Sequence, residues 1–158
     1  MKLTALTAAL ALTAGAVWAQ DVAPTDVSYS EYGEVATPLT AEAGDAERGM
    51  QVFSQRSQGN CVACHVVEQY PDIAFQGEVG PPLSGVGGYR SAEELRGIVA
   101  NAKMTFPDTV MPAFYKTTGF IRPGDAYTGK AASGDLPPIL SAQQIEDVVA
   151  FLLTLQEG

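Results

Sequence analysis

The pentapeptide Cys61-Val62-Ala63-Cys64-His65 constrains this chain more than any other feature. It contains the only two cysteines and the only histidine among 158 residues. Two thiols at this spacing can each form a thioether with one vinyl group of a haem, while the adjacent imidazole binds the iron. We therefore predict one covalently bound haem c, attached through Cys61 and Cys64 and ligated by His65.

Two other uses of such a motif fit less well. A zinc site of the cysteine and histidine type needs four ligands, and this chain offers three. A thioredoxin-like redox pair expects a strand before the motif. Residues 46–53 have instead the apolar spacing of a helix, with Ala46, Gly49, Met50 and Phe53 on one face.

The second axial ligand cannot be another histidine of this chain, which leaves methionine, lysine, tyrosine, water or a residue of a partner. Met50 lies on an apolar helix face, where a thioether usually belongs to the core. Met111 lies in a proline-bounded loop, and we predict it as the ligand, with Met104 as the alternative. A thioether ligand raises the iron potential relative to imidazole. A ligating histidine also donates its other N–H to an acceptor, and the turn around Pro81 could supply a carbonyl or be only a rigid turn.

The first 19 residues have the pattern of a cleavable signal peptide. A basic Lys2 precedes an apolar run from Leu3 to Ala14, and the small residue Ala19 ends the segment. The run is shorter than the ~20 apolar residues that cross a bilayer. We expect export to the periplasm without a membrane anchor, the alternative being an anchor or a buried helix.

Residues 20–43 contain prolines, acids and two tyrosines but no helical or alternating pattern. We expect an extended N-terminal arm that is either a disordered terminus or lies on a partner chain. The domain proper would then cover residues 44–158. A net charge of −9 argues against a nucleic-acid partner, because phosphate binding needs clustered lysine and arginine.

Three helices are predicted in this domain. Asp45 is an N-cap for the first, and Ser91 and Ser141 begin capping boxes with Glu94 and Gln144. The later helices have apolar stripes at Leu95, Ile98, Val99 and Ala102, and at Ile145, Val148, Val149, Leu152 and Leu155, with Phe151 beside the second stripe. Glu146 and Asp147 lie near a helix start, where negative charge is favourable. Glycine and proline exclude helix from residues 80–88 and make 103–140 a long loop. An all-α fold with so small a core needs a cofactor to fill it.

These motifs resemble class I cytochrome c over residues 44–157. The resemblance rests on Gly49 and Phe53, the Cys-x-x-Cys-His motif, Gly80-Pro81-x-Leu83-x-Gly85, Met111-Pro112 and Phe151. It implies that the first and last helices cross at these residues around one haem. It also implies that Pro81 supplies the carbonyl to His65, that Leu83 packs on the haem and that Met111 binds the iron.

The acidic arm, the segment Met111-Pro112-Ala113-Phe114 and residues 139–152 further resemble the SoxX family of sulfur-oxidation cytochromes. The resemblance implies a periplasmic heterodimer with a SoxA-like cytochrome subunit, which oxidatively conjugates thiosulfate to a cysteine of a carrier protein. This chain would accept electrons from the partner's catalytic haem and pass them to a transient acceptor. Both cysteines are used for thioethers, so we assign no catalytic residue here, and whether the chain counts as part of the enzyme stays open.

Two other functions remain. A free, diffusible periplasmic electron shuttle would commonly use a ring of lysines for steering, whereas the segment after residue 19 has only Lys103, Lys116 and Lys130. A haem protein that binds gas or peroxide would need an open sixth position.

Overall fold

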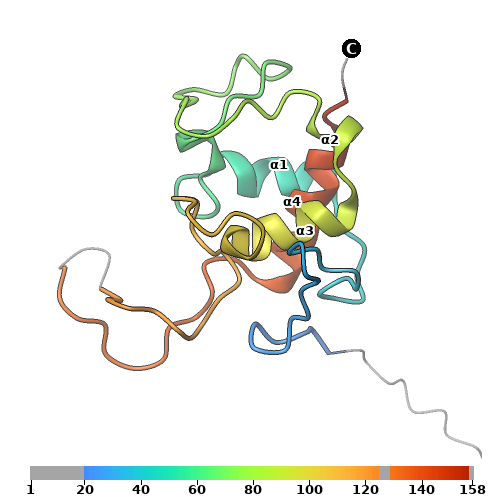
Figure 1. The fold of residues 1–158 in the computed structure, drawn as a ribbon. Helices are drawn as coiled ribbons and strands as arrows, with labels where there is room; N and C mark the ends of the chain where they lie inside the picture. The colour runs from blue at the N-terminus through green and yellow to red at the C-terminus, as the bar shows by residue number, and fades with distance from the viewer. Residues whose placement is uncertain (1–19, 125–128, 157–158) are drawn as a thin grey trace, which may run out of the picture.

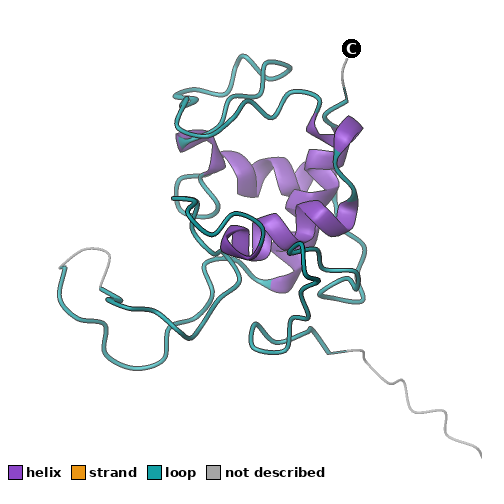
Figure 2. Cartoon of the chain, in the orientation of Figure 1, coloured by secondary structure: helices purple, strands orange, loops and turns teal. Residues whose placement is uncertain are grey.

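The computed structural model describes residues 20–124 and 129–156, so the expected signal peptide lies outside the described residues (Figure 1). Helices joined by long loops make up this part of the chain, and no strand occurs in it (Figure 2). One isolated antiparallel bridge joins Gly124 to Ala131. The elements in chain order are α1 (Ala46–Ser54), the 3-10 turn η1 (Cys61–Ala63), α2 (Val86–Tyr89), α3 (Ala92–Asn101), the 3-10 turn η2 (Ala102–Met104) and α4 (Ala142–Thr154). The predicted all-α fold is confirmed.

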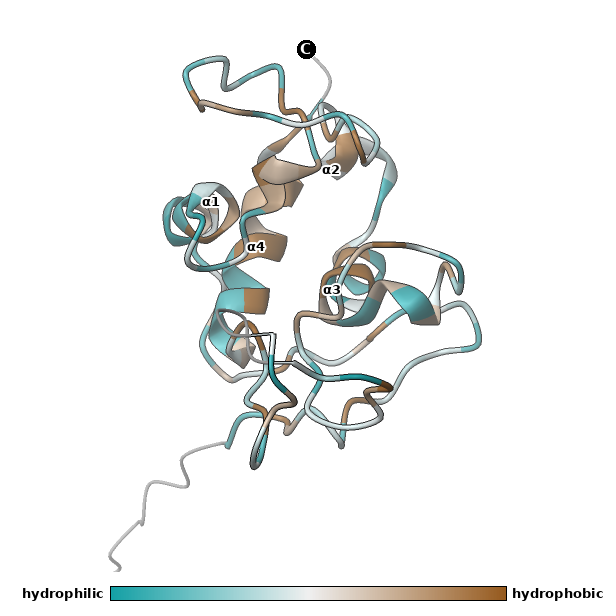
Figure 3. Cartoon of the chain, turned by 90° about the vertical axis from the view of Figure 1, so that its left-hand side faces the viewer, coloured by the Kyte–Doolittle hydropathy of each residue, from teal (hydrophilic) through white to brown (hydrophobic). Residues whose placement is uncertain are grey.

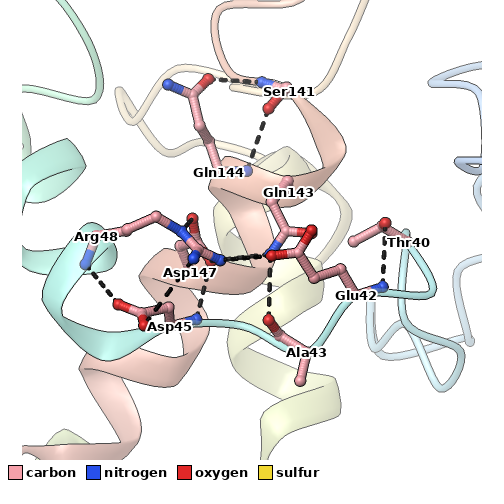
Figure 4. Close-up of polar contacts among 9 residues, drawn as sticks. All are labelled: Thr40, Glu42, Ala43, Asp45, Arg48, Ser141, Gln143, Gln144 and Asp147. Carbon is pink, nitrogen blue, oxygen red and sulfur yellow. Dashed lines mark hydrogen bonds and ion pairs between the residues drawn. The ribbon is translucent and has the colours of Figure 1, made fainter.

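The three predicted helix starts are present. The Asp45 carboxylate accepts a hydrogen bond from the backbone N–H of Arg48 at 2.8 Å. Ser91 and Ser141 each form a complete capping box, the second of which Figure 4 shows. These contacts satisfy backbone donors that have no partner within the helix, which explains why the helices begin at these residues.

Helices α1 and α4 cross at a glycine. A Cβ atom on Gly49 would lie 1.9 Å from the backbone oxygen of Asp147, so only glycine lets the two backbones come this close. One turn further, the rings of Phe53 and Phe151 pack with centroids 5.3 Å apart and a 55° tilt. The crossing that the family resemblance implied is therefore present.

The expectation that residues 80–88 contain no helix is wrong at their end, where α2 begins at Val86. Gly85 enters the helix with φ of 80°. The Gly87 N–H donates to the Leu155 oxygen at 2.9 Å, and a Cβ on Gly87 would lie 2.5 Å from the Leu153 oxygen. Packing against the end of α4 thus outweighs the poor helix propensity of glycine.

The arm, residues 20–43, packs against its own domain. Val35 is 2% exposed and Leu39 is 1% exposed, and both belong to the core that α3 and α4 help to build. The sequence suggested a disordered terminus or an arm on a partner chain. This intramolecular packing is a third arrangement, in which the arm supplies part of the small core that three helices leave incomplete.

A polar junction, formed by Arg48, Arg96, Glu146 and Asp147, holds α1, α3 and the arm to the first turns of α4. Arg96 donates to both Glu146 oxygens, at 2.7 and 3.0 Å, and both side chains are 7% exposed. Arg48 makes the corresponding pair of bonds to Asp147, at 2.9 and 3.0 Å (Figure 4). Glu146 and Asp147, which the sequence suggested as charges near a helix start, are therefore buried ion-pair partners.

The surroundings of α4 change along its length. Figure 3 shows hydrophilic residues near its first turns and hydrophobic ones along the rest, where Phe151, Leu152 and Leu155 are buried. Residues 117–124 and 129–138 belong to a long loop region that leaves the helical body (Figure 1). In the described part of the chain no helix is long and apolar enough to span a membrane.

Candidate haem site

The predicted site residues line one cavity of about 480 Å³. Cys61, Cys64 and His65 line it together with Pro81, Leu83 and Met111. The helices contribute apolar side chains to the walls, namely Phe53 from α1, Leu95, Ile98 and Val99 from α3, and Val148 and Leu152 from α4. Tertiary packing thus brings together residues that lie up to 99 positions apart in the sequence, from Phe53 to Leu152.

A tight turn places the Cys61–His65 motif at the cavity. Asn60 has a left-handed backbone with φ of 48°, and the 3-10 turn η1 follows it. The backbone N–H groups of Cys64 and His65 both donate to the Cys61 oxygen, at 3.1 and 3.0 Å. Asparagine tolerates the left-handed region better than most residues, so the sequence Gln58-Gly59-Asn60 suits this sharp entry.

His65 has one ring nitrogen engaged. Its Nδ1 lies 2.8 Å from the carbonyl oxygen of Pro81, which is the predicted partner atom. A carbonyl can only accept, so Nδ1 carries the proton and Nε2 keeps its lone pair for a metal. Of the two interpretations of the Pro81 turn, this geometry favours the carbonyl acceptor over the rigid turn alone.

Gly80 belongs to the motif that carries the family resemblance, but the sequence analysis gave it no role at the site. A Cβ atom there would lie 2.3 Å from Cε1 and 2.8 Å from Nε2 of His65. The Gly80 N–H also donates to the Cys64 oxygen at 2.7 Å. A glycine directly before Pro81 was the available signal, because a proline turn does not itself require glycine at that position, whereas close approach of an aromatic ring does.

Gln76 is a second missed residue, and it shapes the loop between the motif and Pro81. Its side-chain oxygen accepts from the Val67 N–H at 2.6 Å, and its amide nitrogen donates to the Tyr70 oxygen at 2.9 Å. Nothing in the local sequence pattern distinguishes this glutamine from a solvent-exposed one, so only the structure could identify it.

The structure separates the three candidate methionines. Met111 lines the cavity and is half-buried, whereas Met104 is 45% exposed and does not line it. Met50 packs against the core from α1 and does not line the cavity either. Among these three, Met111 is the one that the fold brings to the cavity containing His65.

Cys61 does not have the properties of a reactive thiol. Cys61 and Cys64 form no disulfide, and desolvation raises the pKa of the Cys61 thiol to about 12. A neutral, desolvated thiol is a poor nucleophile at pH 7. Within residues 20–124 and 129–156 no cluster of three or more histidine, cysteine or acidic side chains could hold a metal ion. The donor set of two thiols, one imidazole and one thioether in an apolar cavity fits haem c and not zinc.

The cytochrome c family model matches residues 46–156, and the chain belongs to this family. It has the class I fold with one covalently bound haem c, and Cys61 and Cys64 fit the attachment motif.

The chain is similar to a chain in the crystal structure of SoxXA from P. pantotrophus, with 54% identity and a TM-score of 0.83. The match covers 87% of this chain and 100% of that one, which confirms the predicted SoxX resemblance. The crystal structure of the c-type cytochrome SorU from Sinorhizobium meliloti has 24% identity and a TM-score of 0.43, with 70% and 90% covered. No curated protein matches the chain.

Proposed function

We propose that this chain is the monohaem cytochrome subunit of a periplasmic complex that joins thiosulfate oxidatively to a cysteine of a carrier protein. The observation that carries the proposal is the likeness to a SoxXA chain over the whole of that chain at 54% identity. A SoxA-like cytochrome would be the partner in a heterodimer. The signal-peptide pattern of residues 1–19 supports the periplasmic location.

The residues around the cavity have separate tasks in this proposal. Cys61 and Cys64 attach the haem, and His65 binds the iron through Nε2 while Pro81 fixes the ring through Nδ1. Met111 would supply the second iron ligand, and Leu83 would pack against the haem, since both line the cavity. When bound, haem c supplies a one-electron redox couple whose potential a methionine ligand raises.

The available side chains support a relay rather than a catalytic centre. Joining thiosulfate to a thiol forms an S–S bond and releases two electrons and one proton, which one haem cannot accept together. Neither cysteine is free to carry sulfur once the thioethers form, and the only histidine is held by Pro81. The chemical step therefore belongs to the partner, and this chain passes single electrons to a downstream acceptor.

Counting haems in the native complex tests the proposal. The exported protein is purified at low salt, and its mass and haem content are determined by light scattering and haem assay. A stable heterodimer with a second haem protein is expected. A monomer with one haem would instead support the diffusible shuttle.

The axial ligand has its own test. In the oxidised protein, Met111→Ala is expected to abolish the weak far-red absorption band that methionine ligation produces, whereas Met104→Ala keeps it. Met104 is a matched control because it is exposed and does not line the cavity. Retention of the band in Met111→Ala would show that another group binds the iron.

A further inference from the structure

The segment that carries Met111 has little structure of its own. Between Thr105 and Tyr115 there is no helix, and Val110 is 82% exposed. Its internal hydrogen bonds are local ones, such as those from the Met111 N–H to Thr109 Oγ1 at 3.2 Å and from the Thr109 N–H to the Phe106 oxygen at 3.0 Å. From outside the segment, Lys103 Nζ donates to the Thr109 oxygen, and otherwise the position of Met111 depends on what holds the two ends of the segment.

At the first end of the Met111 segment, the arm packs closely against Thr105. Gly33 has φ of +87°, and a Cβ atom on it would lie 2.2 Å from Thr105 Oγ1 and 2.8 Å from the Thr105 nitrogen. On its other side, a Cβ on Gly97 of α3 would lie 1.9 Å from the Gly33 oxygen. The turn at Gly33 thus fills the space between α3 and the start of the Met111 segment, with backbone contacts on both sides.

At the second end, the arm accepts a hydrogen bond from Tyr115. The Tyr115 hydroxyl donates to the Val22 oxygen at 2.6 Å, and Tyr115 is 5% exposed. The neighbouring Phe114 is also buried and lines the cavity. The Val22 N–H in turn donates to the Leu39 oxygen at 2.8 Å, so the acceptor belongs to a fixed part of the arm.

The arm can hold these two contacts because it is anchored independently of the Met111 segment. Arg96 donates to the Val35 oxygen at 2.8 Å, and Glu146 accepts from the Leu39 N–H at 2.8 Å. Both anchors belong to the buried ion pair between α3 and α4. A backbone tied to two helices is a rigid support for a loop that has no secondary structure.

We propose that the arm of residues 20–43 positions the Met111 ligand loop, acting through Gly33 on Thr105 and through the Val22 carbonyl on Tyr115. The inference rests on the proposed role of Met111 as iron ligand. None of the described cavity-lining residues belongs to the arm, so the arm residues are positioning residues. Their contribution is to hold the thioether in place against competing ligands.

Imidazole affinity of the oxidised holoprotein, measured by visible absorption, tests this role, because imidazole must displace the methionine. Tyr115→Phe removes one neutral hydrogen bond, and we expect imidazole affinity to rise by roughly 2- to 10-fold. Gly33→Ala places a Cβ against Thr105 and is expected to raise the affinity at least as much.

Two matched controls separate positioning from general damage. Tyr29→Phe changes another arm tyrosine, whose hydroxyl makes no hydrogen bond within the described residues. Gly134→Ala introduces the same backbone strain at φ of +93°, where a Cβ would meet nothing within 4 Å. Both variants are expected to keep the affinity of the unchanged protein.

The outcomes distinguish this inference from the proposed function. If Tyr115→Phe and Gly33→Ala lower Tm but leave imidazole affinity unchanged, the arm is only structural and the inference is overturned. An equal rise in both control variants would overturn it as well. If Met111→Ala keeps the far-red band, the ligand assignment itself fails. If Met111→Ala loses the far-red band while Tyr115→Phe and Gly33→Ala keep the imidazole affinity of the unchanged protein, Met111 is the ligand and only the role of the arm is overturned.

Discussion

The haem cavity and the polar junction are built in opposite ways. The cavity walls come mostly from apolar side chains, and Arg90 is the only charged residue that lines it. The polar junction lies on α4 directly before Val148 of the cavity wall, and it satisfies its charges within the chain, through Arg48, Arg96, Glu146 and Asp147. The cavity therefore depends on a prosthetic group, while the polar junction is complete without one.

The comparison shows that this small domain keeps its cofactor cavity and its buried ion pairs in different regions. An apolar cavity of about 480 Å³ leaves wall atoms without packing partners unless a group fills it. A buried, doubly hydrogen-bonded ion pair needs nothing more, but loses stability sharply when one partner is removed. The two regions should therefore respond differently to substitution.

Preventing haem attachment should have the largest effect. In the double variant Cys61→Ala, Cys64→Ala, we expect complete loss of covalent haem and, because the apolar cavity is then unfilled, loss of most native helical signal. Haem staining of denaturing gels and far-UV circular dichroism measure the two effects. Met111→Ala is the control, since it leaves both thioethers possible and should stain normally. A double variant with the unfolding midpoint of the holoprotein would contradict this account of the cavity.

Breaking the buried ion pair should come next. Glu146→Ala leaves Arg96 buried without its partner and removes the acceptor of the Leu39 N–H. Such truncations cost about 3–5 kcal/mol, measured here by urea unfolding of the holoprotein. Glu42→Ala is the control because Glu42 is the exposed partner of Arg48, with 67% of its side chain accessible. Exposed pairs contribute about 0–1 kcal/mol. Equal losses of unfolding free energy in Glu146→Ala and Glu42→Ala would show that the buried ion pair contributes no more to stability than the exposed one.

The smallest expected effect is a pH dependence at Asp147. Burial of this carboxyl, which is 4% exposed, tends to raise its pKa, but hydrogen bonds from Arg48, the Asp45 N–H and Gln143 outweigh burial and lower the pKa below its usual 3.8. The charged form is thus favoured by folding. Its stabilisation is fully present above the unfolded pKa and is lost as pH falls through the lower folded value.

Asp147→Asn should therefore cost about 1–2 kcal/mol at neutral pH, and the difference from the unchanged protein should shrink as the pH falls below about 4. Urea midpoints across the acid range measure this, with the exposed Asp72→Asn as control. A difference that stays constant from neutral to acid pH would rule out the carboxylate as its source.

Much of the site was predictable because its signals are local. The Cys61–His65 motif encodes haem attachment in five consecutive residues, and the caps at Asp45, Ser91 and Ser141 bond to backbone groups three positions away. The methionine was harder, because the sequence favoured Met111 only through its proline-bounded loop and kept Met104 as the alternative. The fold places Met111 in the cavity, and its role as ligand stays a prediction.

Other features could not be predicted from the sequence because they depend on contacts between residues that are distant in the chain. Helix α2 depends on contacts of Gly87 with the end of α4, more than 60 positions away. Gly80 is required because the His65 ring lies beside it, a contact between residues 15 positions apart that only the fold creates. The arm sequence has no helical or alternating period because it buries single residues, such as Val35 and Leu39, and does not bury one face of a helix or strand.

The sequence by itself determined the family, the attachment of one haem c and the starts of the three main helices. These depend on reactive groups at fixed short spacing and on side chains that bond to nearby backbone. The tertiary structure brought the predicted Met111 to the cavity, and it alone decided where the arm lies and that Glu146 and Asp147 are buried. Such outcomes depend on which distant surfaces meet, and burial, close approach and ion pairing exist only once they have met.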